Sequence, residues 1–288
     1  MLKKPRIREF QLLLAPPLFW LILFFCIPLL LVMAYSFSPQ DVYGGVKHGF
    51  TLEHYQEASD VLYLSILWRS LRYAFTTTLL TALIAYPMAY YMAFASPKTK
   101  LLLMFLVILP FWTNFLIRMY SFIIILSGDG LLNTALLKIG LLKEPLMMLH
   151  NSFAVHIGFI YGNLPYMILP LFAALDKMDS SLLEASMDLG AGHLRTFWRI
   201  TFPQSLAGLA AGIVFVFIPT LGNFVVPELL GSSEDYMLGN VINRQFLGAR
   251  NWPFGAALSS MLTFALMIII ALYIRYFDPV RKQSSMPG

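Results

Sequence analysis

The stretch DSSLLEASMDLGAGHLRTFWRITFP, residues 179–203, is a polar interval between two long apolar runs. Ser181, followed three positions later by Glu184, is typical of the capping box that opens a helix. Gly190 has the backbone freedom that ends a helix. A second short amphipathic segment follows, and we expect Pro203 to stop it. The stretch therefore predicts two short helices joined as a compact hairpin, a shape suited to a socket on another protein. A plain solvated linker is the competing interpretation.

Composition places the whole chain in a membrane. Apolar residues make up 58% of the 288 residues and charged residues only 12%, and the mean hydropathy is +0.71. A soluble domain of this length would carry about twice that charge. The lone cysteine, Cys26, excludes a disulfide framework and a thiol metal site within the chain. The net charge of +5 is interpreted as an orientation signal and not as a nucleic-acid footprint.

The apolar runs predict an all-α, polytopic fold with about six transmembrane helices in a single membrane domain. With the N-terminus inside, twelve basic residues fall in cytoplasmic segments and seven in outer segments. This asymmetry favours cytoplasmic N- and C-termini and a cytoplasmic hairpin. The expected domain is 1–288, and its expected spans are about 12–37, 72–95, 101–126, 153–175, 206–230 and 254–277.

Signatures of catalysis are absent from the sequence. No G-x-x-x-x-G-K-[ST] loop occurs, so we expect that this chain does not hydrolyse ATP itself. The five histidines show no metal-ligand spacing, and no Ser/His/Asp arrangement stands out. We therefore expect a non-enzymatic subunit with no catalytic residue, no metal and no cofactor of its own.

Polar and aromatic residues inside or near the spans predict a solute pathway, because such residues are costly in lipid and usually face a cavity or a partner helix. Aromatic faces and a carboxylate would suit an elongated organic cation. Ordinary packing and an interfacial aromatic belt are the plainer interpretation of the same residues. Arg118, inside the third span, is predicted to be structural. The candidate pathway residues are Trp112, Asn114, Tyr120, Asp129, Tyr161, Asn163, Tyr166, Asn223, Phe224 and Glu228.

The hairpin also resembles a family signature. Permeases of bacterial ABC importers carry Glu-Ala-Ala, three residues, Gly, nine residues, Ile, one residue and Leu-Pro. This sequence departs from that pattern with Ser186 for the second Ala and Phe202 for Leu, both mild changes. The resemblance implies that the hairpin docks on a separate ATPase subunit. The coupling residues that it implies are Glu184, Ala185, Asp188, Gly190, Ile200 and Pro203.

Longer stretches resemble the permeases of spermidine/putrescine ABC importers. They are LPFWTNFLIRMYS (109–121), GNLPYMILPL (162–171), LLEASMDLGA (182–191), PTLGNFVVPELLG (219–231) and MLGNVINRQFLGARNWPFGAALS (237–259). The resemblance implies a multi-pass protein of the bacterial inner membrane that moves polyamines by alternating access. Its implied partners are a second, homologous permease, a homodimeric ATPase that binds ATP and Mg, a periplasmic or lipid-anchored binding protein, and membrane lipid, but no nucleic acid.

Other transport functions stay open. Relatives that import other small solutes share much of these stretches, so a related ABC importer for another solute is the first alternative. A secondary transporter driven by an ion gradient is the second; such folds often show inverted repeats, and we find no convincing internal repeat. A channel or structural membrane subunit would leave the hairpin without a role.

Overall fold

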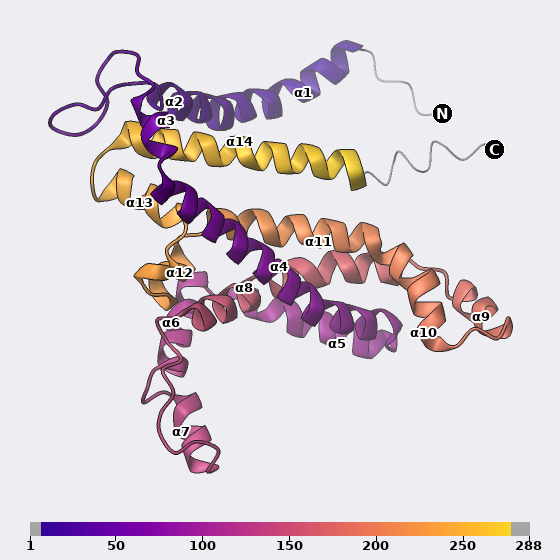
Figure 1. Ribbon diagram of the computed structural model, residues 1–288. Coiled ribbons are helices and arrows are strands. Elements are labelled where there is room, and N and C mark those ends of the chain that lie inside the picture. The colour runs from indigo at the N-terminus through magenta and orange to yellow at the C-terminus, as the bar shows by residue number, and fades with distance from the viewer. Residues whose placement is uncertain (1–6, 278–288) are drawn as a thin grey trace. The chain divides into compact units, whose positions relative to one another are not determined.

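The computed structural model describes the backbone of residues 7–277 and the side chains of residues 14–275. Within that range the chain is helical, and the only strand pairing is an isolated bridge between Gln40 and Val46 (Figure 1). The basic residues at 3–6 and 281–282, which entered the orientation prediction, lie outside the described residues. The helices are α1 Ile7–Leu21, α2 Ile27–Tyr35, α3 Glu53–Ala58, α4 Val61–Phe94, α5 Pro97–Ile108, α6 Phe115–Leu126, α7 Leu131–Lys138, α8 Ser152–Asp176, α9 Ser180–Asp188, α10 His193–Thr196, α11 Phe202–Gly222, α12 Val225–Leu230, α13 Leu238–Leu247 and α14 Trp252–Phe277.

Six segments are long and apolar enough to cross a membrane, as the sequence predicts. They correspond to α2 with the end of α1, α4, α6 with α7, α8, α10 with α11, and α14. The first, fourth and sixth begin and end within two residues of the expected spans, and the other three overlap an expected span but are displaced from it. The bounds of the six are Leu14–Tyr35, Val61–Phe94, Phe115–Lys138, Ser152–Asp176, His193–Gly222 and Trp252–Arg275.

The chain divides into two compact units. The first holds the residues up to Leu64 together with Val241–Met267. Its connection between α2 and α3 is tied down by polar contacts: the hydroxyls of Ser36 and Tyr55 are 2.7 Å apart, and the ring of His54 lies 3.1 Å from the Ser38 carbonyl. These contacts fix the chain as it leaves the first membrane segment.

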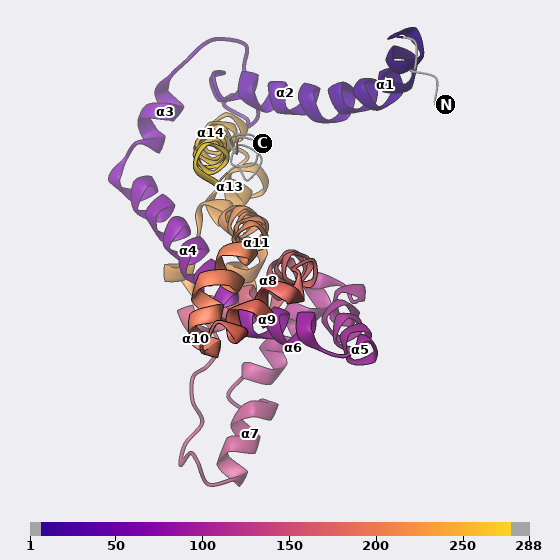
Figure 2. The same cartoon turned by 90° about the vertical axis from the view of Figure 1, so that its right-hand side faces the viewer.

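The second unit holds Ser65–Asn240 with the residues from Ile268 on. Its centre is the pair α8 and α11, which lie side by side in both views (Figures 1 and 2). Gly208 and Gly212 on α11 make this approach possible: a Cβ at Gly208 would lie 2.5 Å from the Pro170 carbonyl oxygen, and one at Gly212 would lie 2.5 Å from the Met167 sulfur. Such small-xxx-small spacing is a common means of close helix packing in membranes.

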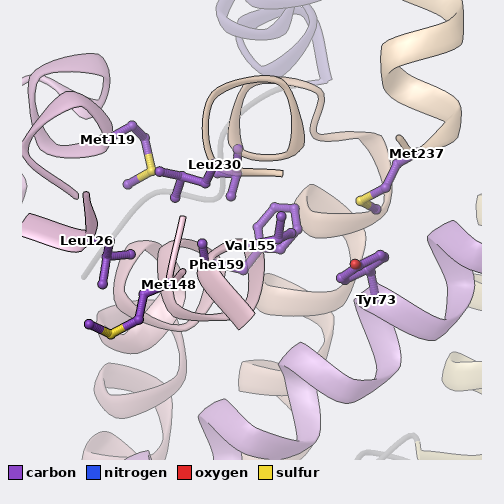
Figure 3. Close-up of a cluster of buried hydrophobic side chains, with 10 residues drawn as sticks. Tyr73, Met119, Leu126, Met148, Val155, Phe159, Leu230 and Met237 are labelled. Carbon is purple, nitrogen blue, oxygen red and sulfur yellow. The ribbon is translucent and has the colours of Figure 1, made fainter. Parts of the chain in front are cut away.

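A buried cluster joins four elements of this unit (Figure 3). Met119 from α6, Phe159 from α8 and Leu230 from α12 are almost fully buried against one another, and Tyr73 brings in α4. The cluster fixes α6 and α12 against α8, so that the segments preceding α6 and α12 are held at defined positions.

Two of the expected spans are interrupted. The expected third span, 101–126, contains α5, a short 3₁₀ turn at Leu109–Trp112 and then α6, because Thr113 and Asn114 are extended. The expected fifth span, 206–230, breaks at Asn223, between α11 and α12. In both breaks an asparagine caps the following helix: Asn114 Oδ1 accepts the Leu116 N–H at 2.8 Å, and Asn223 Oδ1 accepts the Val226 N–H at 3.0 Å. These side-chain bonds replace the helical bonds that the breaks remove.

Candidate functional site

The hairpin predicted at 179–203 is present, but its first helix is capped differently from the prediction. Asp179 is the N-cap of α9, and its Oδ1 accepts the Ser181 N–H at 3.0 Å. The expected capping box from Ser181 to Glu184 is therefore wrong, because the N-cap is Asp179 and the helix begins two residues earlier than that box requires. The hydrogen bond from the Ser181 backbone lowers the pKa of the exposed Asp179 carboxyl below its usual value.

Gly190 ends α9, as expected. Its φ is +80°, and the two hydrogen bonds that follow, from the Gly190 N–H to the Met187 carbonyl (2.9 Å) and from the Ala191 N–H to the Ser186 carbonyl (3.1 Å), form a Schellman motif. The Ser186 hydroxyl also lies 2.9 Å from that of Thr196, which joins α9 to α10. Ser186 is one of the two positions that depart from the family signature, and its hydroxyl holds the two arms of the hairpin together.

The second arm does not stop at Pro203. After α10 the chain passes through one π-helical turn, Phe197–Thr201, and continues into α11, where Pro203 lies in the first turn. Proline is tolerated in the first turn of a helix, because a backbone N–H there would have no helical partner. The π-helical turn that precedes it changes the local backbone geometry. The hairpin is therefore continuous with a membrane helix.

The surface of the hairpin is apolar and open. The side chains of Leu189, Leu194 and Trp198 are 89%, 73% and 58% exposed. A groove of about 500 Å³ lies between the two arms, and we call it the hairpin groove. Among the residues implied by the family signature, Ala185 and Ile200 line it, whereas Glu184 and Asp188 are exposed on α9. The lining of the groove is Leu182, Ala185, Ser186, Leu189, Ala191, Arg195, Arg199 and Ile200.

A second hollow, of about 280 Å³, lies between α6, α8 and the break that separates α11 from α12. We call it the central hollow. Three predicted pathway residues, Asn163, Tyr166 and Asn223, line it together. The Asn163 side chain donates to the Phe159 carbonyl at 2.8 Å and to the Thr220 hydroxyl at 3.3 Å, so it also joins α8 to α11.

Both helix breaks open onto the central hollow. Phe111 precedes the first break and Phe115 follows it, and Pro219 and Val226 flank the second; all four line the hollow. Broken helices expose backbone polar groups that a continuous helix would use internally, and in membranes they are tolerated where they line a cavity. Arg118, predicted to be structural, lines the same hollow, with its guanidinium carbon 4.8 Å from the centre of the Phe111 ring.

The other predicted pathway residues lie elsewhere. Glu228 accepts a hydrogen bond from the Asn240 amide at 2.9 Å, and Asn114 caps α6. Tyr161 packs edge-on against Phe122, 5.1 Å between ring centres. The remaining four, which are exposed on separate parts of the surface, are Trp112, Tyr120, Asp129 and Phe224.

A buried polar network escaped the sequence analysis. The Tyr73 hydroxyl donates to Asp235 Oδ1 at 2.5 Å and lies 2.6 Å from the Ser152 hydroxyl. Ser232 donates its backbone N–H and its hydroxyl to the other carboxylate oxygen, at 2.9 and 2.7 Å. We call these four residues the Asp235 network. The Ser232-x-x-Asp235 spacing is itself a capping-box signal, but no local pattern indicates Tyr73.

Ionisation of Asp235 is favoured by this network. Burial acts on the carboxyl most strongly and would raise its pKa, but the hydrogen bonds from Tyr73 and Ser232, with the charge of Arg69, together lower the pKa below its usual value. The carboxylate is therefore an anchor that ties the segment after α12 to α4.

Comparison with known proteins gives consistent results. The family model described as "Binding-protein-dependent transport system inner membrane component" matches residues 85–283. The spermidine/putrescine transport system permease protein PotB of Haemophilus influenzae is 43% identical over 256 residues, 89% of this chain and 90% of that protein. PotB of Escherichia coli is 42% identical over 89% of this chain and 93% of its own length. The inner membrane ABC transporter permease protein YdcU of Escherichia coli is 33% identical over 94% of this chain and 89% of its own length.

Among solved structures, a chain of a bacterial ABC transporter that imports the acidic polysaccharide alginate has the same fold. Its TM-score is 0.73 at 18% identity, with 93% of this chain and 95% of that chain covered. Permeases of this kind are multi-pass inner membrane components without catalytic residues or a cofactor of their own, and their function implies a complex with a binding protein and an ATPase. Because the family model matches most of this chain, residues 85–283, the chain belongs to the binding-protein-dependent transport system inner membrane components.

Proposed function

We propose that this chain is a permease subunit of an ATP-driven importer that moves spermidine and putrescine into the bacterial cytoplasm. The observation that carries the proposal is the similarity, across about nine tenths of the chain, to permeases named for spermidine and putrescine transport. The hairpin and the central hollow are the two parts that such a permease needs: one to receive force from an ATPase and one to let a solute pass.

The hairpin is the proposed coupling element. Leu189, Leu194 and Trp198 present apolar surface that is exposed in the isolated chain, and patches of this kind mark sites of protein association. Docking on a homodimeric ATPase would bury these side chains, with Glu184 and Asp188 at the polar rim. Because α10 continues into α11 without a loop, a displacement of the hairpin acts directly on a membrane helix.

The central hollow is the proposed part of the solute pathway that this chain contributes. Tyr166 offers an aromatic face, and Asn163 and Asn223 offer amide groups beside two helix breaks. Amide oxygens and aromatic faces are suitable partners for ammonium groups. A second, homologous permease would supply the opposite wall, and closure of the ATPase would move the two walls between inward-facing and outward-facing arrangements.

Uptake of labelled spermidine and putrescine tests this proposal. Cells that lack their own polyamine importers receive this chain with its neighbouring transporter genes, and matched cells receive the same set with an inactive ATPase. We expect uptake that needs both an active ATPase and this chain. An assembled complex that takes up neither amine would overturn the polyamine assignment. Uptake that survives ATPase inactivation but stops when the proton gradient is abolished would instead favour a secondary transporter.

A related importer for another small solute is the second candidate, and one observation favours it. Among the residues that line the central hollow, the one ionisable cation is Arg118, and no carboxylate lines the hollow with it. A positive lining would suit a neutral or anionic solute. Competition against the labelled amine by neutral and acidic solutes separates the two candidates.

A further inference from the structure

The second arm of the hairpin is joined to α4 by a cluster of aromatic rings. Phe197, in the π-helical turn, packs edge-on against Tyr86 of α4, with 5.6 Å between the ring centres. Tyr90, one turn farther along α4, approaches the same ring at 6.1 Å. Phe197 also contacts Trp198 at 5.3 Å, and Trp198 belongs to the exposed apolar surface of the hairpin. Adjoining rings therefore lead from the proposed docking surface to α4.

A hydrogen bond strengthens this contact. The Tyr86 hydroxyl lies 2.8 Å from the hydroxyl of Ser205 on α11, and the Ser205 side chain is fully buried. The Ser205 hydroxyl donates its one proton to the Phe202 carbonyl at 2.9 Å, so Tyr86 is the donor in the bond between the two hydroxyls. Loss of one partner from a buried hydrogen bond is costly. Tyr86 therefore holds α4 against the start of α11, where the hairpin continues into that helix.

Farther from the hairpin, α4 and α11 are less closely packed. An apolar hollow of about 380 Å³ lies between them and also reaches α14. Its lining from α4 extends from Phe75 to Ala82, and its lining from α11 extends from Leu209 to Ile218. Side chains that border a hollow make fewer attractive contacts than closely packed ones. The contact at Tyr86 is therefore the place where movement of the hairpin acts most directly on α4.

The same helix is tied to the segment at 231–240, on the far side of that hollow. There the Tyr73 hydroxyl donates to Asp235 within the Asp235 network. Tyr73 and Tyr86 are 13 positions apart, which is about 20 Å along a helix. The stretch between them contains neither glycine nor proline. Because a continuous helix is a rigid element that can carry energetic coupling, a displacement applied at Tyr86 reaches the Asp235 network.

We propose that Tyr86 is a positioning residue that transmits movement of the hairpin along α4 to the segment at 231–240. The proposal rests on the proposed function in taking the hairpin as the place where an ATPase acts. Through α11 the hairpin acts on the central hollow, and through Tyr86 it acts on the opposite end of the α8–α11 pair. Rigid-body displacement of packed helices then changes both regions in the same step.

The test uses the complete complex, with its ATPase and second permease, in vesicles. Cys26→Ala removes the lone cysteine, and Ser233→Cys places a spin label at an exposed position of the segment at 231–240. The change in label mobility on addition of a non-hydrolysable ATP analogue is measured in this parent, in Tyr86→Phe and in Tyr91→Phe. Tyr91→Phe is the matched control, because Tyr91 is 64% exposed on the same helix.

We expect the nucleotide to change label mobility in the parent and in Tyr91→Phe. Tyr86→Phe keeps the ring but removes the hydroxyl, and it should reduce this change by about fivefold, the effect of one lost hydrogen bond. Ser205→Ala should have a similar effect, and the double variant should be no worse than either, because both substitutions remove the same bond. Melting temperatures in detergent show whether each variant is still folded.

Three results would overturn the role of Tyr86. The first is a label in the parent that does not respond to the nucleotide. The second is an equal response in Tyr86→Phe and Tyr91→Phe. The third is failure of both Tyr86→Phe and Ser205→Ala to assemble, because it indicates a packing role. If Tyr86→Phe alone fails to assemble, Ser205→Ala gives the answer.

Uptake of labelled amine by the parent complex separates this role from the proposed function. A complex that imports no amine, but whose label response depends on Tyr86, retains the transmission role and loses the polyamine assignment. A complex that imports amine, and whose label responds equally in every variant, retains the assignment and loses the transmission role.

Discussion

The hairpin at 179–203 and the segment at 231–240 lie at opposite ends of the α8–α11 pair (Figure 1). They differ in where their side chains find contacts. Bonds within the hairpin are local, and its large apolar side chains are exposed. The segment at 231–240 is tied to distant elements: Asp235 binds Tyr73, and the Leu238 N–H donates to the Ser70 hydroxyl at 2.8 Å. The segment at 231–240 is therefore packed against other parts of this chain, whereas the hairpin exposes an apolar surface of the kind that a partner protein would bury.

The largest loss of stability is expected from a substitution in the Asp235 network. Asp235→Ala removes a buried acceptor and leaves the Tyr73 hydroxyl and the Ser232 N–H without their partner. We expect the free energy of unfolding to fall by about 2–4 kcal/mol, since loss of a charged acceptor leaves buried donors unpaired. Thermal unfolding in detergent measures the effect, and Glu234→Ala, at the exposed neighbouring position, is the matched control. Equal melting temperatures for the two variants would show that the network does not anchor the segment.

Charge reversal on the hairpin should give the opposite result. Glu184 is exposed on α9 and forms no ion pair within the described residues. Glu184→Lys should therefore change the unfolding free energy by less than about 0.5 kcal/mol, while uptake by the complete importer falls by about tenfold or more, because a reversed charge enters the proposed docking site. Glu144→Lys makes the same charge change at an exposed position away from the hairpin. Undiminished ATP-dependent uptake by Glu184→Lys would remove the coupling role of this end.

Replacement of one exposed apolar side chain on the hairpin should have a smaller effect, which is limited to binding of the ATPase. Leu189 is 89% exposed and lines the hairpin groove. Leu189→Ser should leave thermal unfolding of the isolated chain unchanged and weaken binding of the ATPase by about tenfold, since burial of one leucine contributes about 1.5–3 kcal/mol at most. Leu131→Ser, on α7, is the control, because Leu131 is 70% exposed away from the hairpin. A binding assay with purified ATPase compares the two, and equal affinities would place the docking surface elsewhere.

The two ends also differ in how far the sequence reveals them. The hairpin follows from local patterns: a cap, a glycine and an amphipathic run lie within 25 residues, and only the cap residue and the role of Pro203 differ from expectation. The Asp235 network joins residues 162 positions apart. Local periodicity carries no information about such a contact, so only the Ser232–Asp235 cap was within reach of the sequence.

The central hollow lies between these extremes. Polar residues in apolar spans predicted a solute pathway and not the two helix breaks, and three of the ten candidate pathway residues line one hollow. The direction of each side chain determines whether the other candidates reach the hollow, and the sequence does not reveal that direction. Trp112 and Asn114 sit at the first break, yet one is exposed and the other caps α6. Arg118 was predicted to be structural; its guanidinium lies beside the Phe111 and Phe115 rings, and none of the residues that line the hollow with it is a carboxylate.

The smallest expected difference between the two ends is in how the melting temperature depends on acidic pH. The pKa values of both Asp235 and Asp179 are lowered in the folded chain, so each ionised carboxylate stabilises the fold above the unfolded value of about 3.9, and that contribution is lost as the pH falls through the folded pKa. Asp235 is buried with three donors, whereas Asp179 is fully exposed. Between pH 5 and pH 3, Asp235→Asn should therefore flatten the pH dependence of the melting temperature, and Asp179→Asn should follow the wild-type curve. Identical slopes for the wild type and Asp235→Asn would show that the carboxylate charge does not contribute to the anchor.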